Sequence, residues 1–443
     1  MDKMIDLQLI IKRRDEFIFQ FKKQKLTTII MKETSSLGQQ YQDTRQTTLD
    51  LCTPLSPEDY VVQPIVDVSP PKWHLGHTTW FFENFILANE PGYQLFNPEF
   101  NYFFNSYYES QGERVLRTNR GNMTRPTIQE IKDYRQHVDV HMKQFFAKYA
   151  EVPQDLFYVL DVGIQHEKQH QELLVTDLKY ILGGNPLFPV YHQNGVHQSE
   201  AFDLTEKYLP VEAGVYTIGY QGDGFYYDNE TGVHQVYLHP YQVQNRLITN
   251  GEYLEFMQAG GYENFEHWLA EGWDWVNQNQ VKAPYYWFQQ KGEWYHYFKK
   301  INPYEPVTHV SFYEADAFAK WRGKRLPTEF EWEIACNQYT SQVPSNANFL
   351  ESKHFVPVSK TNDDNQLFGD VWEWTNSAYL PYPYYQKAEG GLGEYNGKFM
   401  INQMVLRGGS CATPKDQIRS TYRNFFHADK RWQFTGIRLA ESL

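Results

Sequence analysis

Two histidines four residues apart carry the clearest chemical signal in the sequence. His166 and His170 begin and end the string HEKQH, which lies inside a long segment with helical periodicity. Residues at i and i+4 share one face of a helix, so both imidazoles can reach one metal ion. The string also fits the HExxH pattern of zinc proteases. Because most histidines on helices are structural or solvated, the spacing alone leaves several interpretations open.

A third histidine ligand has to come from another part of the chain. The string WHLGH at 73–77 offers two candidates, His74 and His77. His77 is preferred, and the small Gly76 beside it would permit close approach of a neighbouring helix. Three histidines without a protein carboxylate would leave open coordination positions for a substrate or dioxygen.

Long helices in the first half of the chain must position these histidines. Periodicity predicts helices over 73–87, 127–149 and 155–182. Thr127 and Glu130 form a capping-box pattern at the start of the second helix, and the string GGNP that follows residue 182 is a strong stop. Such helices predict an antiparallel bundle.

The second half of the chain has a different residue pattern, and we expect the boundary between the two domains within 186–205. Short runs such as GVYTIGY and HQVYLHPYQV alternate with Gly, Asn and Pro, and many Trp and Tyr residues follow without a clean period. This pattern predicts an α+β domain with much irregular structure. Residues 1–35 read as an N-terminal extension to which we assign no function.

Composition excludes several classes of protein. The 443 residues carry a formal net charge of −13, which argues against a nucleic-acid binder. The three cysteines, Cys52, Cys336 and Cys411, are too far apart for a CxxC metal site and too few for a disulfide framework. No secretory leader and no apolar run of 18 residues is found, so we expect a cytoplasmic protein without membrane contact.

Four strings in the second half occur together and in order. They are RLPTEFEWE at 325–333, GDVWEWT at 369–375, LRGGS at 406–410, and YRNFF followed by TGIRL within 422–439. Together they resemble the domain of formylglycine-generating enzymes (sulfatase-modifying factors), which implies a C-type-lectin-like fold over 200–443.

The first half resembles a DinB-like four-helix bundle that carries a metal-binding HxxxH helix, over 36–190. The combination resembles the ergothioneine-type sulfoxide synthases, and its most diagnostic strings are WHLGH, FNSYYESQGERVLRTNRGNMTRP and HEKQHQELL. This resemblance implies an iron(II) enzyme that uses dioxygen to join a thiol to the imidazole of hercynine (N-α-trimethylhistidine). The expected partners are therefore small molecules; the oligomeric state is left open.

The resemblance also implies roles for particular residues. It makes His77, His166 and His170 the metal ligands and Gln169 a contact of the histidine-derived substrate. The remaining assignments are Asn424 and Phe425 near the trimethylammonium group, and Tyr107 and Tyr108 beside the iron. Phe426 stands where γ-glutamylcysteine-using members have an acidic residue, which favours cysteine as the sulfur donor. No cysteine follows Cys411, which argues against oxidation of sulfatase cysteines.

The chemistry of the expected reaction gives these residues physical tasks. A phenol such as Tyr107 or Tyr108 can supply a proton or a hydrogen atom to the reacting dioxygen. A quaternary ammonium group cannot donate a hydrogen bond and is best held by aromatic faces such as that of Phe425. The cysteine carboxylate needs a cation, for which the three arginines after the tyrosine pair are candidates: Arg114, Arg117 and Arg120.

Other functions stay open at this stage. An ovothiol-type reaction on unmethylated histidine and selenium–carbon coupling would use the same kind of site. A non-catalytic ligand-binding module is a further alternative, since the second domain also serves as a binding scaffold. A zinc protease is the poorest of these, because the chain beyond HEKQH resembles no such enzyme.

Overall fold

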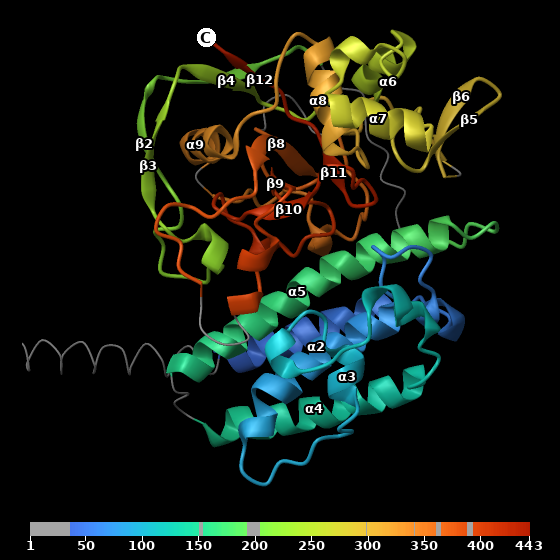
Figure 1. Cartoon of the computed structure of the whole chain (residues 1–443), viewed down its shortest axis with the longest axis vertical. Helices are drawn as coiled ribbons and strands as arrows, with labels where there is room; N and C mark the ends of the chain where they lie inside the picture. Colours follow the sequence, from blue (N-terminus) through green and yellow to red (C-terminus); the bar gives the residue numbers. More distant parts are fainter. Residues whose placement is uncertain are drawn as a thin grey trace, which may run out of the picture.

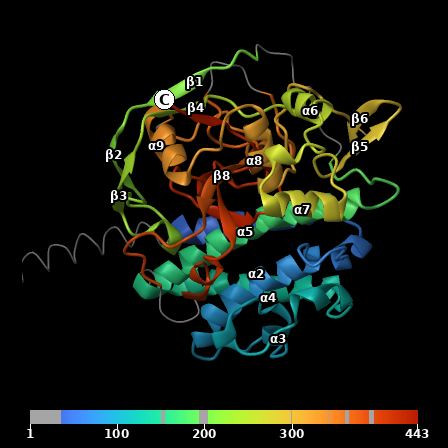
Figure 2. The ribbon, with the colours of Figure 1, turned by 45° about the horizontal axis from the view of Figure 1, so that its top comes forward.

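The computed structural model describes residues 36–149, 154–192, 204–297, 299–340, 342–359, 365–387 and 393–443. The predicted extension 1–35 lies outside them. Figure 1 shows a helical part formed by the first half of the chain and a mixed part formed by the second half. Helix α5 lies between the two parts in both views (Figures 1 and 2). The predicted α+β class is confirmed.

The helical part is a bundle of four main helices, as the sequence predicted. Its members are a helix over 36–52, α2 (Pro71–Phe85), α4 (Ile128–Lys148) and α5 (Gln154–Gly183), with the short α3 (Phe100–Phe104) beside them. Helix α2 is buried over most of its length and packs against both α4 and α5. A helix in the middle of a bundle has no solvent face, which explains why α2 is rich in aromatic residues.

Local sequence explains where the helices begin and end. The Thr127 hydroxyl accepts a hydrogen bond from the Glu130 backbone N–H, and the Glu130 carboxylate accepts one from the Thr127 backbone N–H, which confirms the predicted capping box of α4. Helix α5 ends at Gly183, at the start of the predicted GGNP stop. Pro71 opens α2 at a position where a missing N–H costs nothing.

The mixed part contains four small sheets and four helices. The sheets have the strand orders β1-β4-β12, β10-β9-β8-β11, β2-β3 and β5-β6-β7. The strands are β1 (Tyr208–Val211), β2 (Gly214–Ile218), β3 (His234–Leu238), β4 (Tyr241–Gln244), β5 (Trp287–Gln290), β6 (Glu293–His296), β7 (Lys299–Lys300), β8 (Trp372–Ala378), β9 (Gln403–Arg407), β10 (Asn424–His427), β11 (Thr435–Gly436) and β12 (Ala440–Ser442). The helices are α6 (Asn250–Gln258), α7 (Ala270–Asn279), α8 (Phe312–Trp321) and α9 (Glu329–Tyr339). Long irregular connections join them, as predicted.

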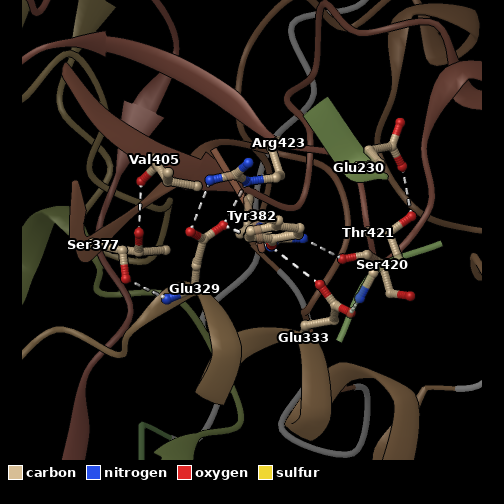
Figure 3. A network of polar contacts seen from close by, with 12 residues as sticks. Glu230, Glu329, Glu333, Ser377, Tyr382, Val405, Ser420, Thr421 and Arg423 are labelled. Atoms are coloured by element: carbon tan, nitrogen blue, oxygen red, sulfur yellow. Dashed lines mark hydrogen bonds and ion pairs between the residues drawn. The ribbon is translucent and has the colours of Figure 1, made fainter. Parts of the chain in front are cut away.

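Three of the four sequence motifs meet in one buried ion network (Figure 3). Glu329 of RLPTEFEWE accepts bonds of 2.8 and 3.0 Å from Arg423 of YRNFF, and a further bond of 2.9 Å from Arg407 of LRGGS. Tyr382 also donates to Glu329, at 3.0 Å. Because buried charges of this kind are costly unless fully paired, the network fixes the start of β10, which carries Asn424 and Phe425.

One large hydrophobic core runs from the bundle into the sheets. A partly buried carboxylate on α5 adds polar contacts across the junction. Glu172 accepts bonds from Trp372 at 2.6 Å, from Ser410 at 2.8 Å and from Thr413 at 2.8 Å. The long helix of the bundle is therefore also a structural element of the mixed part.

Candidate metal centre

Three buried histidines from two helices meet at the centre of the bundle. His77 comes from α2, and His166 and His170 come from successive turns of α5. One ring nitrogen of each lies within 4.8 Å of the others, and the Nε2 atoms of His77 and His166 are 3.1 Å apart. Neutral imidazole nitrogens converging in this way form a donor set suited to a transition metal.

Backbone contacts and burial determine the state of these rings. Phe104 O lies 2.6 Å from His77 Nδ1, so Nδ1 carries the proton and Nε2 is left as the donor atom. As the sequence suggested for Gly76, α3 approaches closely there: a Cβ on Gly76 would meet the Phe104 ring at 2.2 Å. Burial lowers the pKa of His166 to about 3 and the pKa of His77 and His170 well below the ordinary value. The three histidines are therefore neutral at physiological pH, the state that metal binding requires.

His74, the alternative third ligand, lies behind His170 instead. Its Nδ1 is 2.8 Å from His170 Nδ1, and its Nε2 is 3.0 Å from Asp177 Oδ2. Asp177 also accepts a bond of 2.9 Å from the Ser69 backbone and one of 3.3 Å from Trp432. A carboxylate that orients a histidine ligand in this manner is a common feature of metal sites.

The Glu of the HEKQH string is held in the bundle core. Glu167 is fully buried and pairs with Arg45 at 3.0 Å and Arg135 at 2.5 Å, while Thr48 donates a further bond of 2.7 Å. Burial alone would raise the pKa of Glu167, but the Arg135 and Arg45 guanidiniums lower it to about 2. Its carboxylate is engaged with the helices around it, so Glu167 is not placed as the general base of a zinc protease.

We expect Glu167→Gln to lower the free energy of unfolding by about 3–5 kcal/mol, because two buried guanidiniums lose their shared carboxylate. The pH dependence follows from the lowered pKa. The contribution of Glu167 to the free energy of unfolding is fully present above the pKa of glutamate in the unfolded chain, which is near 4. It is lost as the pH falls towards 2. Urea denaturation of both forms between pH 3 and pH 7 measures this difference.

The matched control is Glu109→Gln, which removes a carboxylate that is 71% exposed from its ion pair with Arg114. An exposed pair of this kind contributes about 0–1 kcal/mol. Equal unfolding midpoints for the two variants would contradict the structural role of Glu167.

Gln169, the predicted substrate contact, lies between two tyrosines of the mixed part. Its Nε2 donates to Tyr422 at 2.7 Å, and its Oε1 accepts from Tyr395. The Tyr395 ring lies 5.8 Å from the ring of His166. The sequence did not indicate Tyr395, because it follows a Gly-rich stretch of sequence and belongs to none of the recognised strings.

The predicted tyrosine pair lies near the histidines. Tyr108 is fully buried, and its hydroxyl makes no hydrogen bond of good geometry with the residues that the structure describes. Its ring is 4.7 Å from that of Tyr107 and 5.6 Å from Trp80, which in turn stacks on His77. Burial, followed by the neighbouring phenols of Tyr107 and Tyr395, raises the pKa of Tyr108. Tyr108 therefore keeps its proton.

Asn424 and Phe425 lie further from the histidines. The Phe425 ring stacks on Tyr379 at 4.0 Å and lies 5.9 Å from Phe399, which contacts Tyr107 at 5.4 Å. Asn424 Oδ1 accepts a bond from the Phe425 backbone. The ring of Phe399 thus links Phe425 to the tyrosine pair. Within the described part of the chain, neither Asn424 nor Phe425 contacts any of the three histidines.

The three candidate arginines lie in different environments. Arg114 pairs with Glu109 at the surface, and Arg117 is exposed and donates to the Asp67 carbonyl. Arg120 is buried, and its guanidinium lies 3.3 Å from the centre of the Trp73 ring, which stacks on His77 at 4.4 Å. Arg120 donates only to two hydroxyls, and no carboxylate of the described residues pairs with it.

Comparison with known proteins agrees with both parts of this architecture. Residues 193–443 match the sulfatase-modifying factor enzyme 1-like domain, and residues 40–174 match the DinB superfamily. The described residues contain no helix that is both long enough and apolar enough to cross a membrane.

Individual relatives cover one or both parts. The hercynine oxygenase of Mycolicibacterium smegmatis is 27% identical over 84% of this chain and 91% of its own length. That of Mycobacterium tuberculosis is 28% identical, also over 84% and 91%. The formylglycine-generating enzyme of Streptomyces coelicolor is 29% identical over 43% of this chain and 73% of its own. The chain therefore belongs to the sulfatase-modifying factor enzyme 1-like family, and with its DinB-type bundle it resembles the ergothioneine-biosynthesis sulfoxide synthases.

Proposed function

We propose that this protein is an oxidoreductase of ergothioneine biosynthesis, a sulfoxide synthase that joins cysteine to the imidazole of hercynine with iron(II) and dioxygen. The observation that carries the proposal is the meeting of three buried histidines next to Gln169 on α5, with the buried phenol of Tyr108 one aromatic ring away from His77. The hercynine oxygenases named above, which match both parts of the chain, support the same reaction.

The three histidines fit iron(II) because three neutral donors leave several positions free for substrates. Bound there, iron(II) would supply the redox chemistry with dioxygen and would hold the thiol as its thiolate. Gln169 would orient the substrate imidazole, and its hydrogen bonds with Tyr422 and Tyr395, which hold its amide in place, support this role. Tyr108, whose pKa burial raises, holds a proton for the reacting oxygen atoms.

Of the three arginines, we favour Arg120 as the partner of the cysteine carboxylate. Arg120 is the buried one of the three, it lies one aromatic ring from His77, and its charge has no acidic partner among the described residues. A bidentate carboxylate would satisfy a guanidinium of this kind. Phe426 packs against Trp432 at 5.4 Å, so no acid stands at this position to bind the amino group of a γ-glutamyl extension.

The decisive experiment loads the protein with iron(II) without air and then admits air in the presence of substrates. Hercynine or histidine is combined with cysteine or γ-glutamylcysteine, and mass spectrometry identifies the products. Hercynylcysteine sulfoxide from the hercynine and cysteine pair is the expected product. Tightly bound zinc with peptidase activity, or no turnover of any pair, would overturn the proposal.

We further expect Asp177→Asn to weaken iron(II) binding by about 10-fold or more, because the amide orients His74, and through it His170, less firmly than a carboxylate. Competition with an iron(II) chelator under anaerobic conditions measures this. The control is Glu172→Gln, which neutralises a partly buried carboxylate of α5 that contacts the mixed part instead. Equal iron affinities in the two variants would show that Asp177 does not position His170.

A further inference from the structure

A cavity of about 290 Å³ lies at the junction of the two parts. The last turns of α5 and the segment 188–192 that follows them form one side, and the other side is formed by strands β5 to β7, the segment 354–357, Phe434 and the stretch that contains Glu305, Pro306 and Thr308. None of the residues assigned above to the metal centre lines it. The lining is largely apolar, with Leu178, Trp287 and Ile301 among its side chains.

Three polar atoms in this lining are buried without a partner. They are Lys179 Nζ, His296 Nε2 and Thr308 Oγ1, and none of them contacts solvent or forms a hydrogen bond with the part of the chain that the structure describes. Leaving a buried donor unpaired costs more than an average hydrogen bond contributes. The Lys179 ammonium can only donate, and His296 Nε2 and Thr308 Oγ1 can donate as well as accept, so one acceptor group can satisfy all three.

The charge of Lys179 has no carboxylate partner among the described residues. Its Nζ lies 4.6 Å from the centre of the Phe434 ring, whereas the lysines of the rim are already paired, Lys299 with Glu305 and Lys300 with Glu293. Burial lowers the pKa of Lys179 to about 7, and the other titratable groups that influence it, Cys411 and Glu305, act in the opposite direction. An anion in the cavity would restore the charged form.

Strained backbone occurs at Tyr297, which lines the cavity, and at Tyr286 and His309, which are the chain neighbours of the lining residues Trp287 and Thr308. Tyr286, Tyr297 and His309 have φ angles of 66°, 55° and 63°, in the left-handed region that side chains other than glycine rarely adopt. Their rings pack together, with centroids 4.9 Å apart for the two tyrosines and 4.7 Å for Tyr286 and His309. Strain of this kind persists where the surroundings hold it, as they often do at binding sites.

We propose that this cavity binds a small monocarboxylate with an apolar body, whose carboxylate is held by Lys179, His296 and Thr308. One cation and two neutral donors match the charge and the acceptors of a carboxylate, and the apolar walls match a hydrocarbon body. A phosphate ester would bring more charge than Lys179 balances. Because both parts of the chain line the cavity, the ligand would strengthen their junction.

Isothermal titration calorimetry with 3-phenylpropanoate as the probe tests this site. We expect saturable binding to the full chain, no binding of the neutral 3-phenylpropanol, and at least about 10-fold weaker binding to Lys179→Met. Lys300→Met, which removes a rim lysine that already has a partner, should bind within about two-fold of the wild type. Titrations in two buffers of different ionisation enthalpy should show that the wild type takes up a fraction of a proton per molecule of probe bound. Lys179→Met should take up none.

Thermal melting and circular dichroism establish that each variant is folded, and Thr308→Val provides a second variant with a smaller expected loss of affinity. The proposal is overturned if the probe does not saturate, if the alcohol binds equally well, or if Lys179→Met keeps full affinity. Binding of inorganic phosphate in place of the carboxylate also overturns it. The site does not depend on the proposed enzymatic function, and iron content measured on the same samples keeps the two conclusions separate.

Discussion

The His170→Ala variant should bind no iron(II) at stoichiometric concentration and should consume no dioxygen with hercynine and cysteine. His170 contacts His74 as well as His77 and His166, and His74 in turn contacts Asp177. The loss of His170 therefore removes one metal donor and breaks this series of contacts to Asp177. Removing an outer contact typically costs 10–100-fold in metal affinity, and removing a ligand should exceed about 100-fold. Iron content after gel filtration and an oxygen electrode measure the two losses.

The chain contains its own matched control for this prediction. His137 and His141 on α4 are also four residues apart, with ring centroids at 4.3 Å, but no third ligand joins them in the described part of the chain. His141→Ala should therefore keep full iron content and oxygen consumption. Circular dichroism checks that both variants remain helical. Iron-dependent oxygen consumption by His170→Ala would show that the three histidines are not the metal site.

The Tyr108→Phe variant should still consume dioxygen and thiol but should form about 100-fold less sulfoxide relative to simple thiol oxidation. The change removes only a hydroxyl, one that is buried and protonated. Positioned proton donors contribute about 10²–10⁴-fold to a rate, so the coupling reaction should lose to the competing oxidation. Mass spectrometry of both products gives the ratio.

Two further variants identify which phenol acts. Tyr107→Phe tests the stacked neighbour, and Tyr395→Phe tests the phenol next to His166 and Gln169. Tyr102→Phe is the control, since Tyr102 is 43% exposed. If both Tyr107→Phe and Tyr108→Phe keep the wild-type product ratio, the tyrosine pair is not the acid, and Tyr395 becomes the leading candidate.

Much of the architecture could be predicted from local sequence. The capping box of α4, the stop after α5 and the alternation of short strands are local signals, and each corresponds to an element of the structure. The HxxxH spacing was a weaker signal, because His137 and His141 show the same spacing without a third histidine near them. Resemblance to a family, more than spacing, supported His166 and His170 as metal ligands.

Contacts between residues far apart in the sequence could not be predicted. Asp177 lies two helical turns beyond His170, but only the packing of α2 against α5 shows that His74 joins them. Tyr395 reaches Gln169 across 226 residues of sequence. The three arginines looked equivalent until burial and the absence of a described acidic partner set Arg120 apart. Burial and distant pairing are tertiary properties, so one sequence without relatives carries little information on them.

The polar contacts of Glu172 limit how this protein could be recombined with its relatives. The boundary between the two sequence domains falls after α5, but the carboxylate on that helix accepts its hydrogen bonds from Trp372, Ser410 and Thr413, about 200 residues later. A chimera spliced at the sequence boundary, with a foreign second half lacking those three donors, would bury an unsatisfied carboxylate at the junction. Grafting this bundle onto another catalytic scaffold would therefore require the outward face of α5 to be redesigned together with its new partner.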